Sequence, residues 1–184
     1  MFITNKLESI KKINELGLNK FPEQLFSEND TEKVIEFLSK YPAKYYAIRD
    51  KSKAGGIFKL KVAYEDVLSE IKGYTLFTIN ASSANYVENQ LLVGEIEVLS
   101  DGRIYAILST NSNYSVRDAL SNPSFNLSTD IFDKKLNQIP CFDIIYKYII
   151  DHRLQNVIVE FAMFDTKVGI KEQNIIIYEL RTHY

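Results

Sequence analysis

The strongest constraint on the fold is a pair of apolar, β-rich runs in the last segment, VIVEFAMFDTKVGIKEQNIIIYELRTHY (157–184). Both runs are too apolar for exposed edge strands, so we expect a sheet that is largely covered. The first run carries Glu160, the second carries Glu179, and Arg181 follows two residues later. Charges in such a sheet are costly unless they are paired, hydrogen-bonded or bound to a metal. This segment is therefore where we expect chemistry.

The two runs predict an antiparallel pair if the chain reverses near Gly169. In that register Glu160 lies opposite Glu179, and Arg181 shares a face with Glu179 and Ile177, because alternate residues of a strand share a face. Like charges that oppose each other destabilise a ladder, so a positive group should stand between them. The candidates are a divalent cation and Arg181. A shift of one residue would put the carboxylates on opposite faces, and the sequence leaves both registers open.

Length and composition suit one domain, residues 1–184, or one domain of two small lobes, about 1–80 and 81–184. The net charge of −2 argues against general nucleic-acid binding, which usually shows a basic excess. No apolar run is long enough to span a membrane, and the N-terminus lacks the apolar core of a signal peptide. We therefore expect a cytoplasmic protein, whose oligomeric state the sequence does not indicate.

The single cysteine, Cys141, excludes an internal disulfide. Its apolar neighbours predict a buried structural thiol, because a catalytic thiol needs an activating partner. Neither His152 nor His183 has a suitable spacing to it. His152 is explained by the negative end of the helix that precedes it.

Hydrophobic periodicity and turn residues predict the elements along the chain. Helices are expected over 5–16, 31–40, 64–72, 116–120 and 140–154, and strands over 44–50, 57–63, 74–80, 91–99, 103–108 and the two terminal runs. Residues 16–26 are expected to form a loop, and 111–130 a surface excursion around the short helix. Gly94 inside a strand indicates a bulge or a close approach of another group. This order predicts an α+β fold with a mostly antiparallel sheet and flanking helices.

A basic segment around a glycine pair is a second candidate site. A strand, a flexible turn and several cations can hold phosphates through backbone N–H groups and charge. The alternative is an ordinary hairpin with solvated lysines. The residues concerned are Arg49, Lys51, Lys53, Gly55, Gly56, Lys59 and Lys61.

These segments resemble the ATP-grasp domain of pyruvate phosphate dikinases and phosphoenolpyruvate synthases. In that domain one strand carries a glutamate, and the next carries an amide or acid followed two residues later by arginine, as in VIVEFAMFD and NIIIYELRTHY. The resemblance implies that Glu160 and Glu179 bind magnesium and that Arg181 contacts phosphate. INELGLNKFPEQLF looks like the loop that enters the fold, with Lys20 near the position of a nucleotide lysine. YYAIRDKSKAGG looks like the strand whose arginine, here Arg49, meets the terminal phosphate.

The resemblance implies a minimal two-lobed fold that binds Mg²⁺ and ATP. Its activity would be phosphoryl transfer or ATP-dependent ligation to an acceptor that the sequence does not identify. Arg49 and Arg181 would be catalytic, and the nucleotide would be bound by Lys51, Lys53, Gly55, Gly56 and Lys59. The main alternative is a non-catalytic α+β binding or interaction protein, in which Arg181 forms a structural salt bridge with Glu160 or Glu179. A metal-dependent phosphodiesterase is a third hypothesis.

Overall fold

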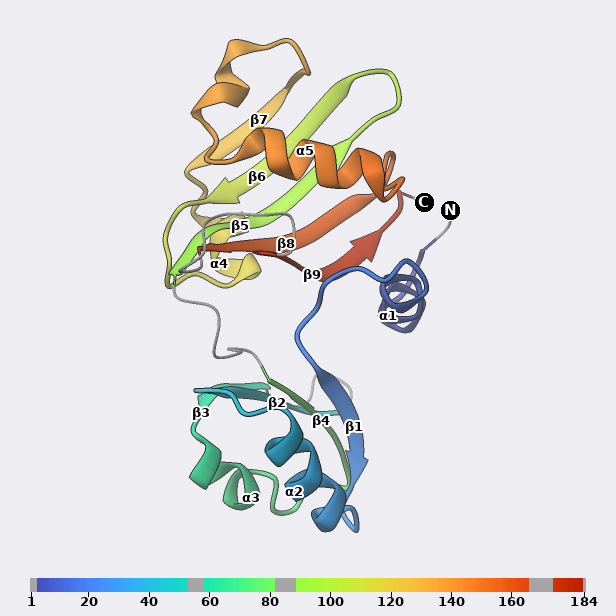
Figure 1. The fold of residues 1–184 in the computed structure, drawn as a ribbon, viewed down its shortest axis with the longest axis vertical. Coiled ribbons are helices and arrows are strands. Elements are labelled where there is room, and N and C mark those ends of the chain that lie inside the picture. Colours follow the sequence, from blue (N-terminus) through green and yellow to red (C-terminus); the bar gives the residue numbers. More distant parts are fainter. Residues whose placement is uncertain (1–2, 53–57, 82–88, 166–173, 184) are drawn as a thin grey trace. The chain divides into compact units, whose positions relative to one another are not determined.

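The chain forms two compact units, each with its own antiparallel sheet and its own core (Figure 1). The computed structural model describes residues 3–52, 58–81, 89–165 and 174–183. The larger unit comprises residues 1–20 and 88–184, and the smaller unit comprises residues 21–87. Residues 3–20 thus pack with the C-terminal part of the chain rather than with residues 21–80. The predicted α+β class with antiparallel pairing is confirmed.

The larger unit is built on a five-stranded sheet with the order β7-β6-β5-β8-β9. The strands are β5 (Asn89–Val98), β6 (Arg103–Ser109), β7 (Phe125–Asp130), β8 (Ile158–Asp165) and β9 (Ile175–Arg181). Helix α5 (Phe142–Asp151) covers one face, which we call the core face, and buries Ile145, Tyr148 and Ile149 there (Figure 1). Helix α4 (Val116–Ser121) packs against β5 and β6, and the short helix η2 (Lys134–Gln138) adds Leu136 to the core.

The N-terminal residues, including helix α1 (Lys6–Glu15), cover the outer edge of β9. Three backbone N–H groups there donate to N-terminal acceptors: Leu180 to Ser9 Oγ at 2.7 Å, Ile177 to Asn19 O at 2.8 Å and Thr182 to Ile3 O at 3.1 Å. β9 is therefore the edge strand of its sheet, yet these backbone N–H groups are hydrogen-bonded within the chain. This cover explains how so apolar a strand is tolerated at an edge.

The smaller unit is a four-stranded sheet with two helices on one face. Its strand order is β1-β4-β2-β3. The elements are β1 (Glu23–Ser27), α2 (Thr31–Lys40), β2 (Tyr46–Asp50), β3 (Phe58–Val62), η1 (Tyr64–Asp66), α3 (Val67–Glu70) and β4 (Leu76–Asn80). Both α-helices lie on the same side of the sheet, where Phe26, Phe37 and Phe77 pack together (Figure 1). Among the described residues of this unit, no helix covers the other side.

Two strands were not predicted, β1 and β7. The first lies where a loop was expected, and Phe26 is its one buried residue. The second lies inside the expected surface excursion, and its half-buried Phe125 and Leu127 alternate with polar residues. Both are edge strands with few apolar residues, so their periodicity is weak.

Two other local predictions can be compared with the structure. Gly94 has φ +147°, and a Cβ there would lie 2.1 Å from the Ile107 carbonyl oxygen, which confirms the predicted close approach. Cys141, which was expected to be buried, is half-buried at the start of α5, and burial raises the pKa of its thiol. Among the described residues, no helix is long and apolar enough to cross a membrane.

Candidate functional site

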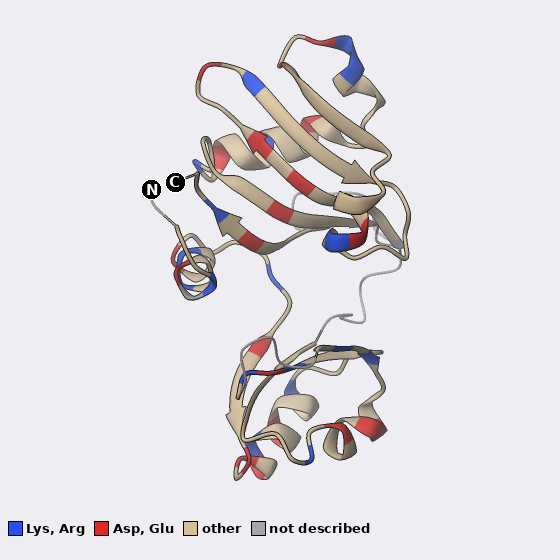
Figure 2. Cartoon of the chain, turned by 180° about the vertical axis from the view of Figure 1, so that it is seen from behind, with Lys and Arg blue, Asp and Glu red and all other residues tan. Residues whose placement is uncertain are grey.

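Three glutamates lie side by side on the face of the larger sheet opposite the core face. Glu160 on β8 pairs with Glu179 on β9 and, on its other side, with Glu95 on β5. Figure 2 shows acidic positions, in red, on neighbouring strands of this sheet. Of the two registers that the sequence left open, the structure has the one that opposes the two terminal carboxylates. Glu95 was missed because its segment shows only the alternation of an ordinary strand. We call Glu95, Glu160 and Glu179 the glutamate row.

A β-bulge in β9 brings the row onto one face. Glu160 pairs with Glu179, but the next pair is Phe161 with Ile177, so Tyr178 is the extra residue. Ile177 consequently lies in the core, whereas Glu179 lies on the opposite face. The expectation that Glu179 shares its face with Ile177 was wrong, because a bulge reverses the alternation of side chains.

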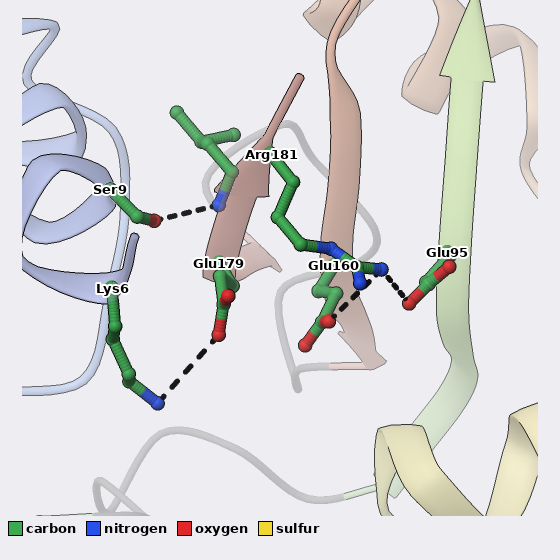
Figure 3. A network of polar contacts seen from close by, with 7 residues as sticks. Lys6, Ser9, Glu95, Glu160, Glu179 and Arg181 are labelled. Atoms are coloured by element: carbon green, nitrogen blue, oxygen red, sulfur yellow. Dashed lines mark hydrogen bonds and ion pairs between the residues drawn. The ribbon is translucent and has the colours of Figure 1, made fainter. Parts of the chain in front are cut away.

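Cationic side chains already contact every member of the row (Figure 3). An Arg181 Nη atom forms an ion pair with Glu95 and lies 3.3 Å from a carboxylate oxygen of Glu160. Lys6 of α1 lies 3.8 Å from Glu179. Of the two candidates for the positive group, the structure places Arg181 beside Glu160. The Arg181 Nε is buried and has no hydrogen-bond partner among the described residues.

Glu160 is the central carboxyl group of the row. Burial raises its pKa from 4.5 to about 7, and the neighbouring Glu179 and Glu95 carboxylates add to the rise, whereas Arg181 opposes it. The side chain is only 19% exposed. The protonated, uncharged form of Glu160 is therefore more favoured than in an ordinary glutamate, and the row carries less negative charge than three carboxylates would.

The row does not fit a metal ion as it stands. Carboxylate oxygens are suitable ligands for Mg²⁺, yet among the described residues no three His, Cys, Asp or Glu side chains are placed to hold one. The guanidinium of Arg181 contacts two of the three carboxylates. A dication 4 Å from it would be repelled by roughly 8 kcal/mol at an effective dielectric constant of about 20, before any attraction to the carboxylates is counted. A metal held by Glu160 and Glu179 therefore requires Arg181 to move.

A second ion pair flanks the row. Glu97 on β5 is buried, with 5% exposure, and points to the same face as Glu95 two residues earlier. One of its oxygens lies 2.8 Å from Nε2 of His183, whose side chain is largely exposed. Sequence reasoning missed this pair because the two residues are 86 positions apart.

Arg49 lies on β2 of the smaller unit. It pairs with Thr78 on β4 and Phe58 on β3, and its guanidinium carbon is 4.7 Å from the centroid of the Phe58 ring. Because Ile48 belongs to the core under the helices, Arg49 faces the side of the sheet without helices. Four exposed apolar side chains lie on the same side of the sheet, namely Leu25, Phe58, Leu60 and Leu76.

The other predicted nucleotide-binding residues do not share that position. Lys59 forms an ion pair with Glu70 of α3 and lies over the Tyr74 ring, so it faces the helices, opposite Arg49. Lys51 directly follows β2, and its backbone N–H donates to the Leu76 carbonyl oxygen at 2.8 Å. The remaining three, Lys53, Gly55 and Gly56, lie outside the described residues. The structure thus groups Glu160, Glu179 and Arg181 in the larger unit, whereas Arg49, Lys51 and Lys59 belong to the smaller unit.

No protein-family model and no curated protein matches the sequence, but solved structures do. D-alanine–D-alanine ligase from Bacillus anthracis aligns with a TM-score of 0.50 at 11% identity, over 97% of this chain and 56% of that one. An N5-carboxyaminoimidazole ribonucleotide synthetase in complex with ADP gives 0.49 at 15% identity, over 98% and 45%. Macrocyclase MdnC from Microcystis aeruginosa MRC, bound with precursor peptide MdnA, gives 0.49 at 15% identity, over 96% and 51%.

The likeness shows the fold. This chain has a small ATP-grasp-like α+β fold with two antiparallel sheets. It spans about half the length of the structures that it matches. The predicted resemblance is confirmed at that level, but not for the dikinase domain in particular, because the structure that aligns with a TM-score of 0.50 is a D-alanine–D-alanine ligase.

Proposed function

We propose that this chain binds ATP and takes part in ATP-dependent ligation or phosphoryl transfer. The observation that carries the proposal is the convergence of Glu160, Glu179 and Arg181 on one sheet face in an ATP-grasp-like fold. These are the residues that the sequence resemblance, to the ATP-grasp domain of dikinases, assigned to the nucleotide site. Fold alone does not determine function, so the proposal rests on this site.

Arg181 is suited to contact a phosphate group. Its side chain is 41% exposed. A guanidinium presents several donors in a planar fork, which matches the geometry of phosphate oxygens. In phosphoryl transfer, such a cation neutralises charge on the group that is transferred. We assign this role to Arg181.

Arg49 is the corresponding candidate in the smaller unit. It lies on a sheet face that has no helices and carries exposed apolar side chains. Among the ion pairs of the described residues, none joins Arg49 to a carboxylate. Apolar surface next to one cation suits a nucleotide, which combines an aromatic base with phosphates. The assignments of Lys51, Lys53, Gly55, Gly56 and Lys59 to the nucleotide remain predictions from the sequence, and Lys59 would have to leave Glu70.

Magnesium is part of the sequence prediction, with Glu160 and Glu179 as its ligands. Bound to the phosphates of ATP, the metal neutralises charge during phosphoryl transfer. We assign no step to it, because cationic side chains already contact both carboxylates. The acceptor of the reaction is likewise not part of the proposal.

A second candidate function is a non-catalytic binding or interaction protein. It is favoured by the ion pairs of the row, which link Arg181 to Glu95 and Glu160 and Lys6 to Glu179. In this case the row is structural, and the chain uses its ATP-grasp-like fold without a nucleotide.

Thermal unfolding separates the two candidates. A ligand that binds only the folded chain stabilises it by ~2.7 kcal/mol at a hundred times its dissociation constant, so ATP should raise the unfolding temperature. Inorganic triphosphate tests whether charge alone is enough. Arg49→Gln should abolish the ATP shift, whereas Lys72→Gln, which removes an exposed cation from the same unit, should preserve it. An unchanged unfolding temperature at saturating ATP, with and without Mg²⁺, would favour the interaction protein.

A further inference from the structure

The glutamate row concentrates like charges on three adjacent strands. Neighbouring strands lie about 4.8 Å apart, so paired side chains are in direct contact range. Glu95, Glu160 and Glu179 are only 16%, 19% and 23% exposed. Three carboxylates in such a place destabilise the sheet unless positive charge is supplied.

The chain supplies the charge itself. A planar guanidinium can bond two carboxylates at once, and Arg181 does so between Glu95 and Glu160 (Figure 3). Lys6 serves Glu179 at the other end of the row. If all three carboxylates are ionised, the two cations change the formal charge of the row from −3 to −1, which weakens its attraction for a dication.

Local backbone structure positions both cations. The extra residue Tyr178 turns Glu179 and Arg181 toward the face that carries Glu160. On the other side, α1 is attached to β9 by the hydrogen bond from Leu180 N–H to the fully buried Ser9, and this attachment places Lys6, one helical turn earlier, beside Glu179. The counter-charges therefore belong to the folded architecture and do not depend on a bound ion.

We propose that Arg181 takes the place of a divalent cation in the glutamate row, so that this chain holds no metal there. The inference concerns the apo chain and does not depend on nucleotide binding. It departs from the sequence prediction that Glu160 and Glu179 are magnesium ligands, and it gives Arg181 a second role as the internal counter-ion of the row.

The proposal predicts that removal of Arg181 creates a metal site. In Arg181→Gln, three carboxylates would face one another with Lys6 as the only cation found near them among the described residues. Carboxylate oxygens of this kind bind Mn²⁺ and Mg²⁺. Loss of the competing charge should tighten Mn²⁺ binding by about tenfold or more, because even a change of 1.4 kcal/mol in affinity is tenfold.

Mn²⁺ binding to the full chain without nucleotide, followed by the electron paramagnetic resonance signal of free Mn²⁺, tests this. Wild type and Arg181→Lys should bind weakly, and Arg181→Gln should bind one ion per chain. The double variant Arg181→Gln/Glu160→Gln should lose that ion. Arg103→Gln is the matched control, because it removes an exposed arginine that pairs with Asp101 in the same unit.

Two results would overturn the proposal. The first is a tight Mn²⁺ site in wild type that Glu160→Gln abolishes. The second is an Arg181→Gln variant that unfolds cooperatively, and so is folded, yet binds Mn²⁺ no better than wild type. If Arg181→Gln does not fold, Lys6→Gln tests the same point from a half-buried position, and it should tighten Mn²⁺ binding by a smaller factor. No ATP is present, so the outcome is separate from the test of the proposed function.

Discussion

Replacing Glu160 with glutamine should remove a pH-dependent destabilisation of the folded chain. Glu160 lies between Glu95 and Glu179, and burial is the main reason that its pKa rises from 4.5 to about 7. Glutamine preserves the size of the side chain and its ability to hydrogen-bond, but it cannot ionise. The substitution therefore isolates the cost of placing a negative charge at the centre of the row.

The sign of the effect follows from the two pKa values. The folded chain holds the proton more tightly than the unfolded chain, so the contribution of Glu160 to stability is complete below pH 4.5 and is lost as the pH rises through about 7. A rise of this size corresponds to about 3 kcal/mol, because each pKa unit is 1.36 kcal/mol. Through Glu160 alone, the free energy of unfolding of the wild type should therefore fall by about that amount between pH 4.5 and pH 8. In Glu160→Gln, the free energy of unfolding should fall by about 3 kcal/mol less than in the wild type over the same pH range.

Urea unfolding followed by circular dichroism, repeated from pH 5 to pH 8.5, measures this dependence. The control is Glu15→Gln, which removes an exposed glutamate of α1 that pairs with lysines. The free energy of unfolding of this control should depend on pH in the same way as that of the wild type. Parallel stability curves for wild type and Glu160→Gln would show that Glu160 does not titrate near neutrality, and the electrostatic description of the row would be wrong.

Three further substitutions test separate parts of the structure. Ser9→Ala should cost ~1–3 kcal/mol in urea unfolding, because it leaves the buried Leu180 N–H without its acceptor, whereas the exposed Ser39→Ala should cost little. Gly94→Ala should cost more than about 2 kcal/mol, since its Cβ would meet the Ile107 carbonyl oxygen at 2.1 Å; Gly102→Ala, with its nearest atom at 3.7 Å, should cost less. Glu95→Gln removes a carboxylate that raises the pKa of Glu160, so a titration of Glu160 by nuclear magnetic resonance should move to lower pH.

The strands and helices with strong periodicity could be predicted from the sequence. The terminal runs, α2 and the β5–β6 hairpin agree closely with their predicted ranges, because long apolar patterns leave few alternatives. Edge strands β1 and β7 were missed, because each presents few apolar residues and depends on its partner for hydrogen bonds. Local patterns do not contain that information.

The candidate site was predicted in part. The period of a strand left two registers open for Glu160 and Glu179, and neither the observed pairing nor the bulge at Tyr178 could be read from an apolar run. Glu95 and Lys6 come from segments far from the terminal hairpin, and only the fold brings them to the row. The contrast between Lys59 and Arg49 also depends on tertiary structure, because the partner of Lys59 lies on α3.

The most direct test of the central claim is equilibrium dialysis of labelled ATP against the full chain. The account predicts saturable binding of ATP, which Arg181→Gln weakens and which Arg103→Gln, at an exposed arginine of the same unit, preserves. Binding should also persist when a chelator removes divalent metal, since the glutamate row already holds its own counter-ions. Absence of saturable ATP binding, in the presence and absence of Mg²⁺, would contradict the claim that this ATP-grasp-like chain binds a nucleotide.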